Sequence, residues 1–288
     1  MPDWLFVDGS SLIFRAFYGV PSSIRSPDGR PVNAVRGFMD RLARLVTDLR
    51  PRRLAVAADD DWRPAWRVDL IPSYKAHRVA EPAPPLLEPQ FPIIEAVLEA
   101  VGIDFVGVPE YEAEDVIATW VAQVPEGSRA DIVSGDRDLF ALVRGAEVRV
   151  LYPEKGGMAE VDEAEVERRY RVPGRSYADY AILRGDPSDG LPGLPRVGDR
   201  TAADLIRRHG SVAGVLEHAR LGEADREYLT RALRVVPPVT NIPLSLPQGI
   251  RSAYPVDAGR VAELSERHGL AGPFERLLRA LPLVGGPS

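Results

Sequence analysis

Short apolar runs alternate with amphipathic stretches over the first 160 residues. Apolar residues at helical spacing predict helices at 35–49, 91–102 and 114–124, and Pro51 ends the first of them. Five short apolar runs have the length and composition of buried strands, at residues 3–7, 53–58, 103–108, 130–134 and 147–152. The first of these runs leads into a turn at Asp8-Gly9. Strands that alternate with helices predict an α/β fold with a parallel sheet.

After residue 160 the strand pattern gives way to helical segments. These lie at 163–170, 177–185, 201–210 and 224–236, with one further helix at 257–281. We therefore expect an α/β unit over residues 1–165 and a helical unit over residues 166–288. The stretch 62–92 is rich in proline, arginine and aromatic residues and has no clear period, which indicates an exposed functional segment.

Composition limits the kind of site. The chain has 288 residues, of which 45% are hydrophobic and 27% charged, as in soluble globular proteins. It has no run of about 18 apolar residues, and its opening lacks the features of a signal peptide, so we expect a cytoplasmic protein without membrane contact. Because there is no cysteine, any metal must bind oxygen or histidine, which favours hard cations.

The formal net charge of −6 argues against a nucleic-acid partner unless the charges are segregated. They are segregated along the chain. Acidic residues gather in a few short segments, whereas arginines recur at positions 63, 67 and 78 and again at 200, 207 and 208. An acidic centre flanked by basic tracks is compatible with both observations.

Five acidic segments carry the candidate chemistry: VDGS at 7–10, AADDDW at 57–62, EAEDVIAT at 112–119, SGDRDL at 134–139 and GDPSDGLPG at 185–193. Three of them follow predicted strands. The carboxyl ends of parallel strands meet at one edge of a sheet, so these acids should converge. Any one acid is more often a cap or a surface charge, but crowded carboxylates require cations between them. Oxygen ligands suit Mg²⁺ or Mn²⁺, and paired ions hydrolyse phosphodiesters.

Taken together, six motifs resemble the 5′ nuclease family, which includes the amino-terminal nuclease domain of bacterial DNA polymerase I, phage 5′ exonucleases and flap endonucleases. The motifs are VDGSSLIFRAF (7–17), AVRGF (34–38), WRVDLIPSYKAHR (66–78), EAEDVIAT (112–119), SGDRDLFALV (134–143) and GDPSDGLPGLPRVGDRTA (185–202). The resemblance implies a PIN-like (resolvase-like) nuclease core and a C-terminal helical domain with a helix-hairpin or helix-turn-helix DNA-binding element. It also implies a stand-alone 5′-3′ exonuclease and flap endonuclease that acts in DNA replication and repair.

The resemblance also implies a ligand set for two Mg²⁺ or Mn²⁺ ions: Asp8, Asp59, Glu112, Glu114, Asp115, Asp136, Asp138, Asp186 and Asp189. In the 59–61 cluster, counting from the strand end selects Asp59 and counting back from Trp66 selects Asp60; we take Asp59. Two positions depart from the family pattern, since Glu114 stands where the family has Asp and Gly190 where it usually has Asn.

Two further elements follow from the resemblance. The segment near 62–92 would form a helical arch, with Tyr74 stacking on an unpaired base and with Lys75, Arg78 and Arg67 as catalytic cations, the first two on the scissile phosphate and its neighbour. The turn at 193–202 would grip the duplex backbone, with a K⁺ ion bridging it to phosphate, through Gly193, Val197, Gly198, Arg200 and Thr201. The expected substrates are DNA with 5′ flaps, nicks or 5′ ends, and RNA primers on DNA, bound by a monomer.

Two other functions fit part of the pattern. A PIN-type metal-dependent ribonuclease also gathers acids at strand ends, but such domains are usually shorter and lack the 185–202 element. A catalytically impaired relative would bind branched DNA without cutting it. Every expected acidic segment is present in this chain, which weighs against loss of the metal ligands.

Overall fold

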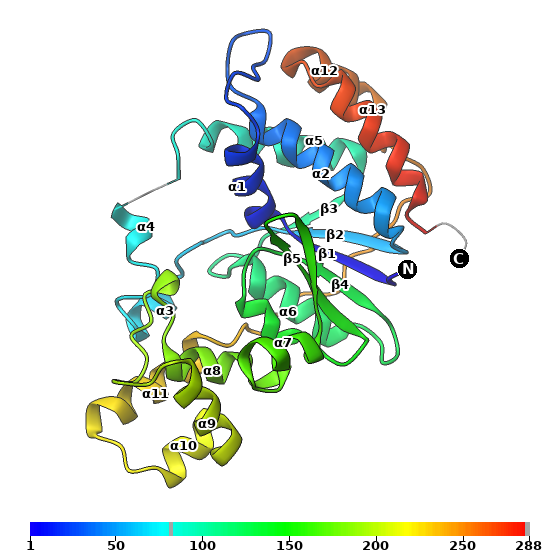
Figure 1. Ribbon diagram of the computed structural model, residues 1–288. Helices are drawn as coiled ribbons and strands as arrows, with labels where there is room; N and C mark the ends of the chain where they lie inside the picture. The colour runs from blue at the N-terminus through cyan, green and yellow to red at the C-terminus, as the bar shows by residue number, and fades with distance from the viewer. Residues whose placement is uncertain (81–82, 286–288) are drawn as a thin grey trace.

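A six-stranded sheet forms the centre of the protein (Figure 1). The computed structural model describes residues 1–80 and 83–285. The strand order is β3-β2-β1-β4-β5-β6, and all neighbours are parallel except the β5 and β6 pair. The strands are β1 (Trp4–Asp8), β2 (Arg53–Ala57), β3 (Asp104–Val106), β4 (Ala130–Val133), β5 (Val148–Glu154) and β6 (Gly157–Val161). The predicted α/β fold with a parallel sheet is confirmed, with one antiparallel edge strand, β6, that the apolar pattern does not predict.

Helices cover both faces of the sheet because alternate residues of each strand point to opposite sides. In β1, Trp4 and Phe6 enter one buried core, while Leu5 and Val7 enter the other. The helices of the α/β part are α1 (Gly9–Gly19), α2 (Asn33–Leu49), α3 (Ala65–Leu70), α4 (His77–Ala80), α5 (Phe91–Val101) and α6 (Ala113–Gln123). The later helices are α7 (Glu163–Tyr170), α8 (Tyr177–Arg184), α9 (Asp199–His209), α10 (Val212–His218), α11 (Glu223–Val235), α12 (Ala258–His268) and α13 (Ala271–Ala280).

The sequence predicts a turn after the first strand, at Asp8-Gly9, but the structure has none there. Helix α1 begins at once, because the Asp8 side chain caps it by accepting a hydrogen bond from the Ser11 backbone N–H at 2.9 Å. The first acid of the site is therefore held by a helix start as well as by a strand end.

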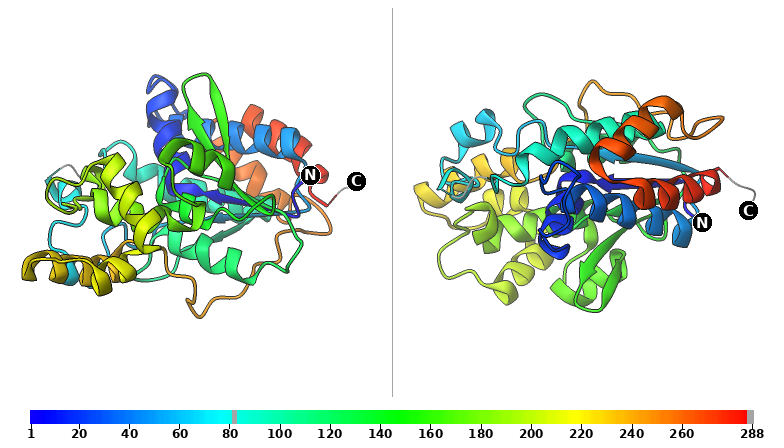
Figure 2. Two further views of the ribbon diagram at one scale, coloured as in Figure 1. Left: turned by 60° about the horizontal axis from the view of Figure 1, so that its bottom comes forward. Right: turned by 90° about the horizontal axis from the view of Figure 1, so that it is seen from above.

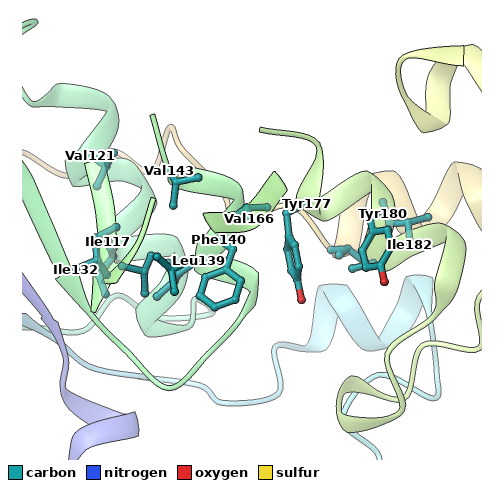
Figure 3. Close-up of a cluster of buried hydrophobic side chains, with 14 of the residues drawn as sticks. Ile117, Val121, Ile132, Leu139, Phe140, Val143, Val166, Tyr177, Tyr180 and Ile182 are labelled. Carbon is teal, nitrogen blue, oxygen red and sulfur yellow. The ribbon is translucent and has the colours of Figure 1, made fainter. Parts of the chain in front are cut away.

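One continuous core joins the sheet to the helices that follow it. Figure 3 shows Tyr177 and Tyr180 of α8 in the same buried cluster as Phe140, Ile117 and Ile132. The cluster extends through α9 and α11 to Val236. The α7 to α11 region therefore shares one continuous buried core with this face of the sheet.

The C-terminal segment departs from the prediction in two ways. Residues 257–281 form two helices, α12 and α13, instead of one. These helices do not join the preceding helical unit, since they pack against α5 and α2 on the opposite side of the sheet, far from α9 and α10 in Figures 1 and 2. Phe274 and Leu277 are buried there among apolar residues of the first unit, and this burial explains the packing.

The stretch 62–92 is partly helical. Its described residues form α3, α4 and a 3₁₀ turn at Glu88–Gln90, while residues 81–82 lie outside the described part. The two α-helices span six and four residues, so the expected arch consists here of short helices and connecting turns. Within residues 1–80 and 83–285, no helix combines the length and apolar character needed to cross a bilayer.

Candidate active site

The predicted acids converge as the sheet geometry requires. A cavity of about 560 Å³ lies at the carboxyl ends of β1, β2 and β4, and eight of the nine predicted ligands line it. They are Asp8, Asp59, Glu112, Glu114, Asp136, Asp138, Asp186 and Asp189. Of the three neighbouring acids at 59–61, Asp59 lines this cavity, whereas Asp60 lines an adjacent hollow.

Hydroxyl groups orient the acids at the ends of β1 and β4. The Ser134 hydroxyl donates to Asp8 Oδ2 at 2.5 Å and accepts from the Asp136 backbone N–H at 2.9 Å. The Asp138 backbone N–H in turn donates to Asp136 Oδ1 at 2.9 Å. Across β2, Ser10 Oγ accepts from the Asp59 N–H at 3.0 Å. These bonds orient the carboxylates of Asp8 and Asp136 and fix the backbone at Asp59.

Crowding and burial raise the pKa values of the central acids. Burial, followed by the charge of Asp59, raises the pKa of Asp8 to about 7. Burial and Glu114 raise the pKa of Asp136 to about 7. Burial and Asp136 raise the pKa of Asp138 well above its ordinary value. A bound cation would relieve this repulsion and favour the ionised forms.

Glu112 lines the cavity and is surrounded on its buried side by a cluster of cations. Its Oε1 is 2.5 Å from Lys75 Nζ, and its Oε2 accepts from Arg67 Nη1 at 2.7 Å and from the Tyr74 hydroxyl at 2.6 Å. Burial and Glu114 nevertheless raise the pKa of Glu112 to about 8, against the opposing effect of Lys75. Lys75 Nζ also lies 3.5 Å from Glu114 Oε1. Arg67 and Lys75 therefore already provide positive charge beside Glu112 and Glu114.

Asp115 is not placed to bind a metal. It is fully buried and lies outside the cavity lining, and Arg67 binds both of its oxygens at 2.7 and 2.8 Å. It also accepts from the backbone N–H groups of Glu112 at 3.1 Å and Val239 at 2.8 Å. In this structure Asp115 is therefore set apart from the other eight predicted ligands, and its hydrogen bonds cap α6 and hold the 236–239 segment in place.

The structure places Arg67 and Tyr74 away from the cavity lining, and their predicted roles toward the substrate stay predictions. The Arg67 side chain is 1% exposed and donates from Nε to the Val235 carbonyl at 3.0 Å, so in this arrangement it does not face the cavity. Tyr74 is 2% exposed, and its hydroxyl is bound to Glu112, so its ring offers no face for a base. Sequence spacing places both residues in the segment, but their direction depends on tertiary packing.

Lys75 and Arg78 occupy different depths. Lys75 is 1% exposed and lies outside the cavity lining, and its predicted contact with the scissile phosphate stays a prediction. Arg78 lines the cavity with its side chain 26% exposed, and its Nη1 lies 3.4 Å from Glu112 Oε1. Of the two, Arg78 is the cation that faces the cavity.

The cavity fits hard divalent cations by its donor chemistry. Its eight carboxylates supply oxygen ligands, and the raised pKa values of Asp8 and Asp136 indicate a need for positive charge. In the described part of the chain, no three acidic or histidine side chains stand close enough together to enclose an ion. The arrangement is thus a ring of candidate ligands around a cavity and not a closed cage.

Ser134 and Arg137 are among the site residues that were not singled out from sequence. Ser134 bridges Asp8 and Asp136, and Arg137 lines the cavity with its Nη2 3.1 Å from Asp186 Oδ2. Both belong to the SGDRDL segment, so their position between acids is a signal available in the sequence. Their side chains gain a role because the turn after β4 faces the cavity.

The predicted duplex-binding turn lies between η4 (Pro187–Asp189) and α9. Gly193 is buried with φ +67°, and a Cβ there would come within 2.5 Å of the Arg184 carbonyl, so this position requires glycine. Gly198 has an extended backbone with open space around it and precedes α9, so the tight turn does not depend on it. Gly198, Arg200 and Thr201 are exposed, and Val197 is half-buried.

Known proteins share this arrangement of sequence and fold. Residues 3–171 match the family model for the 5′-3′ exonuclease N-terminal resolvase-like domain, and residues 172–236 match the model for the 5′-3′ exonuclease C-terminal SAM fold. The chain is 50% identical over 306 residues to a 5′-3′ exonuclease of Streptomyces coelicolor, with 96% of this chain and 99% of that protein covered. It is 37% identical over 300 residues to DNA polymerase I of Mycobacterium bovis, covering 99% of this chain and 32% of the polymerase.

Among solved structures, a bacteriophage T5 flap endonuclease in a pseudo-enzyme-product complex with DNA and metal ions is similar, with a TM-score of 0.68. The alignment covers 97% of this chain and 98% of the phage protein at 17% identity, which supports the fold. The family models together span most of the chain, and the Streptomyces relative matches almost end to end. The chain therefore belongs to the 5′-3′ exonuclease family of nucleases.

Proposed function

We propose that this protein hydrolyses DNA phosphodiesters at 5′ ends and 5′ flaps with two Mg²⁺ or Mn²⁺ ions, in primer removal and repair. The observation that carries the proposal is the convergence of eight carboxylates on one cavity. The family membership supports nuclease chemistry, and the phage flap endonuclease of the same fold is described with DNA and metal ions.

The residues would divide the chemistry between them. Asp8, Asp136, Asp138, Asp186 and Asp189, with Asp59 and Glu114, would hold the ions, which when bound lower the pKa of a water and stabilise the leaving oxygen. Arg78 faces the cavity and would bind the phosphate that is cut. Lys75 and Arg67 would position Glu112 from below.

The duplex beyond the cut would rest on the turn at 193–202. Exposed Gly198, Arg200 and Thr201 at the start of α9 would meet backbone phosphates, aided by the amino terminus of that helix. A K⁺ ion would bridge this turn to a backbone phosphate. Contacts of this kind carry no base specificity, which suits an enzyme that recognises DNA structure.

A matched pair of variants tests the proposal. Purified protein is given Mg²⁺ and either a labelled 5′-flap DNA or a single-stranded RNA of equal length. We expect cleavage of the flap, its loss in Asp59→Asn, and its retention in Asp60→Asn, because Asp59 lines the acidic cavity and its neighbour does not.

The other possible outcomes each contradict the proposal and favour a different function or assignment. Cleavage of the RNA without the flap DNA would favour a ribonuclease of the PIN type. Tight flap binding without cleavage in any divalent metal would favour a catalytically impaired relative. Equal loss of activity in both variants would contradict the assignment of Asp59 within its cluster.

A further inference from the structure

A second cavity, of about 380 Å³, has the opposite charge from the acidic one. It is lined by five arginines, two tyrosines and a single acidic residue. The charged residues are Arg137, Arg169, Arg171, Arg184, Arg200 and Asp199. In a chain with a formal net charge of −6, five guanidinium groups around one hollow indicate selection for an anion.

The arginines come from separate parts of the chain that tertiary packing brings together. Arg169 is on α7 and Arg171 follows that helix, while Arg184 ends α8 and Arg200 is in the first turn of α9. These three helices lie together in the lower part of Figure 1. Gly198, which precedes α9, provides no side-chain cap, so the positive end of that helix adds to the charge.

Ion pairs hold part of this cavity rigid. Arg169 contacts Glu154 and Glu165, each at 2.6 Å, and its side chain is 20% exposed. Arg184 Nε lies 2.6 Å from Asp199 Oδ1, which also accepts from the Tyr180 hydroxyl at 2.8 Å. Such pairing fixes guanidinium groups in place and reduces the entropy lost when a ligand binds.

Two of the five arginines keep their charge available. Among the residues that the structure describes, Arg171 and Arg200 have no acidic partner within 4.0 Å, although both line the cavity. Both residues are exposed. Two free positive charges beside fixed guanidinium groups match one phosphate group.

The basic cavity adjoins the acidic one at Arg137. This side chain lines both hollows, and its Nη2 lies 3.1 Å from Asp186 Oδ2 in the acidic centre. A strand whose phosphodiester lies in the acidic cavity would therefore pass Arg137 and enter the basic one.

We propose that the basic cavity binds a phosphate group of the substrate DNA strand close to the phosphodiester that is cut. Arg171 and Arg200 supply the free charge, and Arg169 and Arg184 supply a fixed frame. This inference rests on the proposed function. It adds to the turn at 193–202, with which it shares Arg200.

The test is the salt dependence of DNA binding. Dissociation constants for flap DNA are measured in Ca²⁺ between about 50 and 200 mM salt, where each phosphate contact contributes about 0.9 to the slope of log K against log[salt]. We expect Arg171→Gln to lower this slope by about one contact and Arg171→Lys to restore it. Arg41→Gln is the control, because it removes an exposed arginine on α2 and changes net charge equally.

Arg169→Gln provides a second variant, with its melting temperature measured to confirm folding. Unchanged slopes in both Arg171→Gln and Arg169→Gln would overturn the inference, and so would an equal loss in the Arg41→Gln control. Substrates with a 5′-phosphate or a 5′-hydroxyl identify the source of the phosphate. A loss on both supports a backbone phosphodiester, and a loss confined to the first supports a terminal phosphate.

The two proposals fail separately. If the wild-type protein cuts flap DNA but the slopes do not change, the basic cavity is a structural cluster of ion pairs. If the slopes change as expected but no flap is cut, the phosphate site stands and the proposed flap cleavage fails.

Discussion

Replacing Arg67 with methionine should destabilise the protein severely without removing any group that faces the acidic cavity. Arg67 is buried and donates hydrogen bonds to Glu112, to both oxygens of Asp115 and to the Val235 carbonyl, at 2.7 to 3.0 Å. Methionine fills much of the same volume but offers no donor. Asp115 would then remain as a buried carboxylate that has lost the cation bound to both of its oxygens.

The expected magnitude follows from the burial of all three side chains. Arg67 and Glu112 are 1% exposed and Asp115 is 0% exposed, so solvent cannot replace the lost partner. Removing one member of such a buried pair costs about 3 to 5 kcal/mol. A typical domain has a free energy of unfolding of about 5 to 15 kcal/mol, so this is a large fraction of the total. The melting temperature should fall by roughly 6 to 20 °C.

Thermal and urea unfolding of the metal-free protein measure this loss. Arg260→Met is the control, because Arg260 and Glu263 form an exposed pair, 43% and 51% exposed, and its loss should change stability by less than about 0.5 kcal/mol. Combining Arg67→Met with Asp115→Asn should recover part of the loss, since the buried charge is removed. If Arg67→Met melts like the wild type, the buried cluster does not depend on Arg67 and the structural assignment is wrong.

Two further predictions concern the loop at Gly190 and the acids of the cavity. Gly190→Ala should lose more stability than Gly127→Ala in urea unfolding and should also slow cleavage. Both positions have positive φ, which costs alanine about 1 to 2 kcal/mol. A Cβ at Gly190 would also lie 1.9 Å from the Ser73 carbonyl oxygen, whereas nothing lies within 4 Å of a Cβ at Gly127. Equal losses would contradict this. In metal-free protein the pKa values of Asp8 and Asp136, raised from 3.8 to about 7 by burial and by neighbouring acids, contribute stability that is full below pH 3.8 and is lost as the pH rises through 7. The protein in EDTA should therefore melt at a lower temperature at pH 8 than at pH 5, and Mg²⁺ should narrow the difference; a flat profile in EDTA would refute the proposed crowding.

The sequence by itself determined the α/β order, the five predicted strands to within one or two residues at each end, and the convergence of the acidic residues. Strand and helix periods are local properties, and parallel strands bring their carboxyl ends to one edge whatever the details of packing. The acids that follow β1, β2 and β4 therefore had to lie close together, and eight of the nine predicted ligands line one cavity. The motif resemblance added the acids that do not follow a strand, such as Asp186 and Asp189.

Tertiary structure decided which charged residues face the substrate. Arg67, Tyr74 and Lys75 stand in the same basic segment as Arg78, yet the first three point beneath the cavity to Glu112 and Asp115. The basic cavity likewise exists because α7, α8 and α9 bring distant arginines together. The direction of a side chain depends on which buried partner can compensate for its desolvation, and that partner is often far away in the sequence. Hydrophobic burial also carries α12 and α13 back to α5 and α2, against the prediction from their place in the chain.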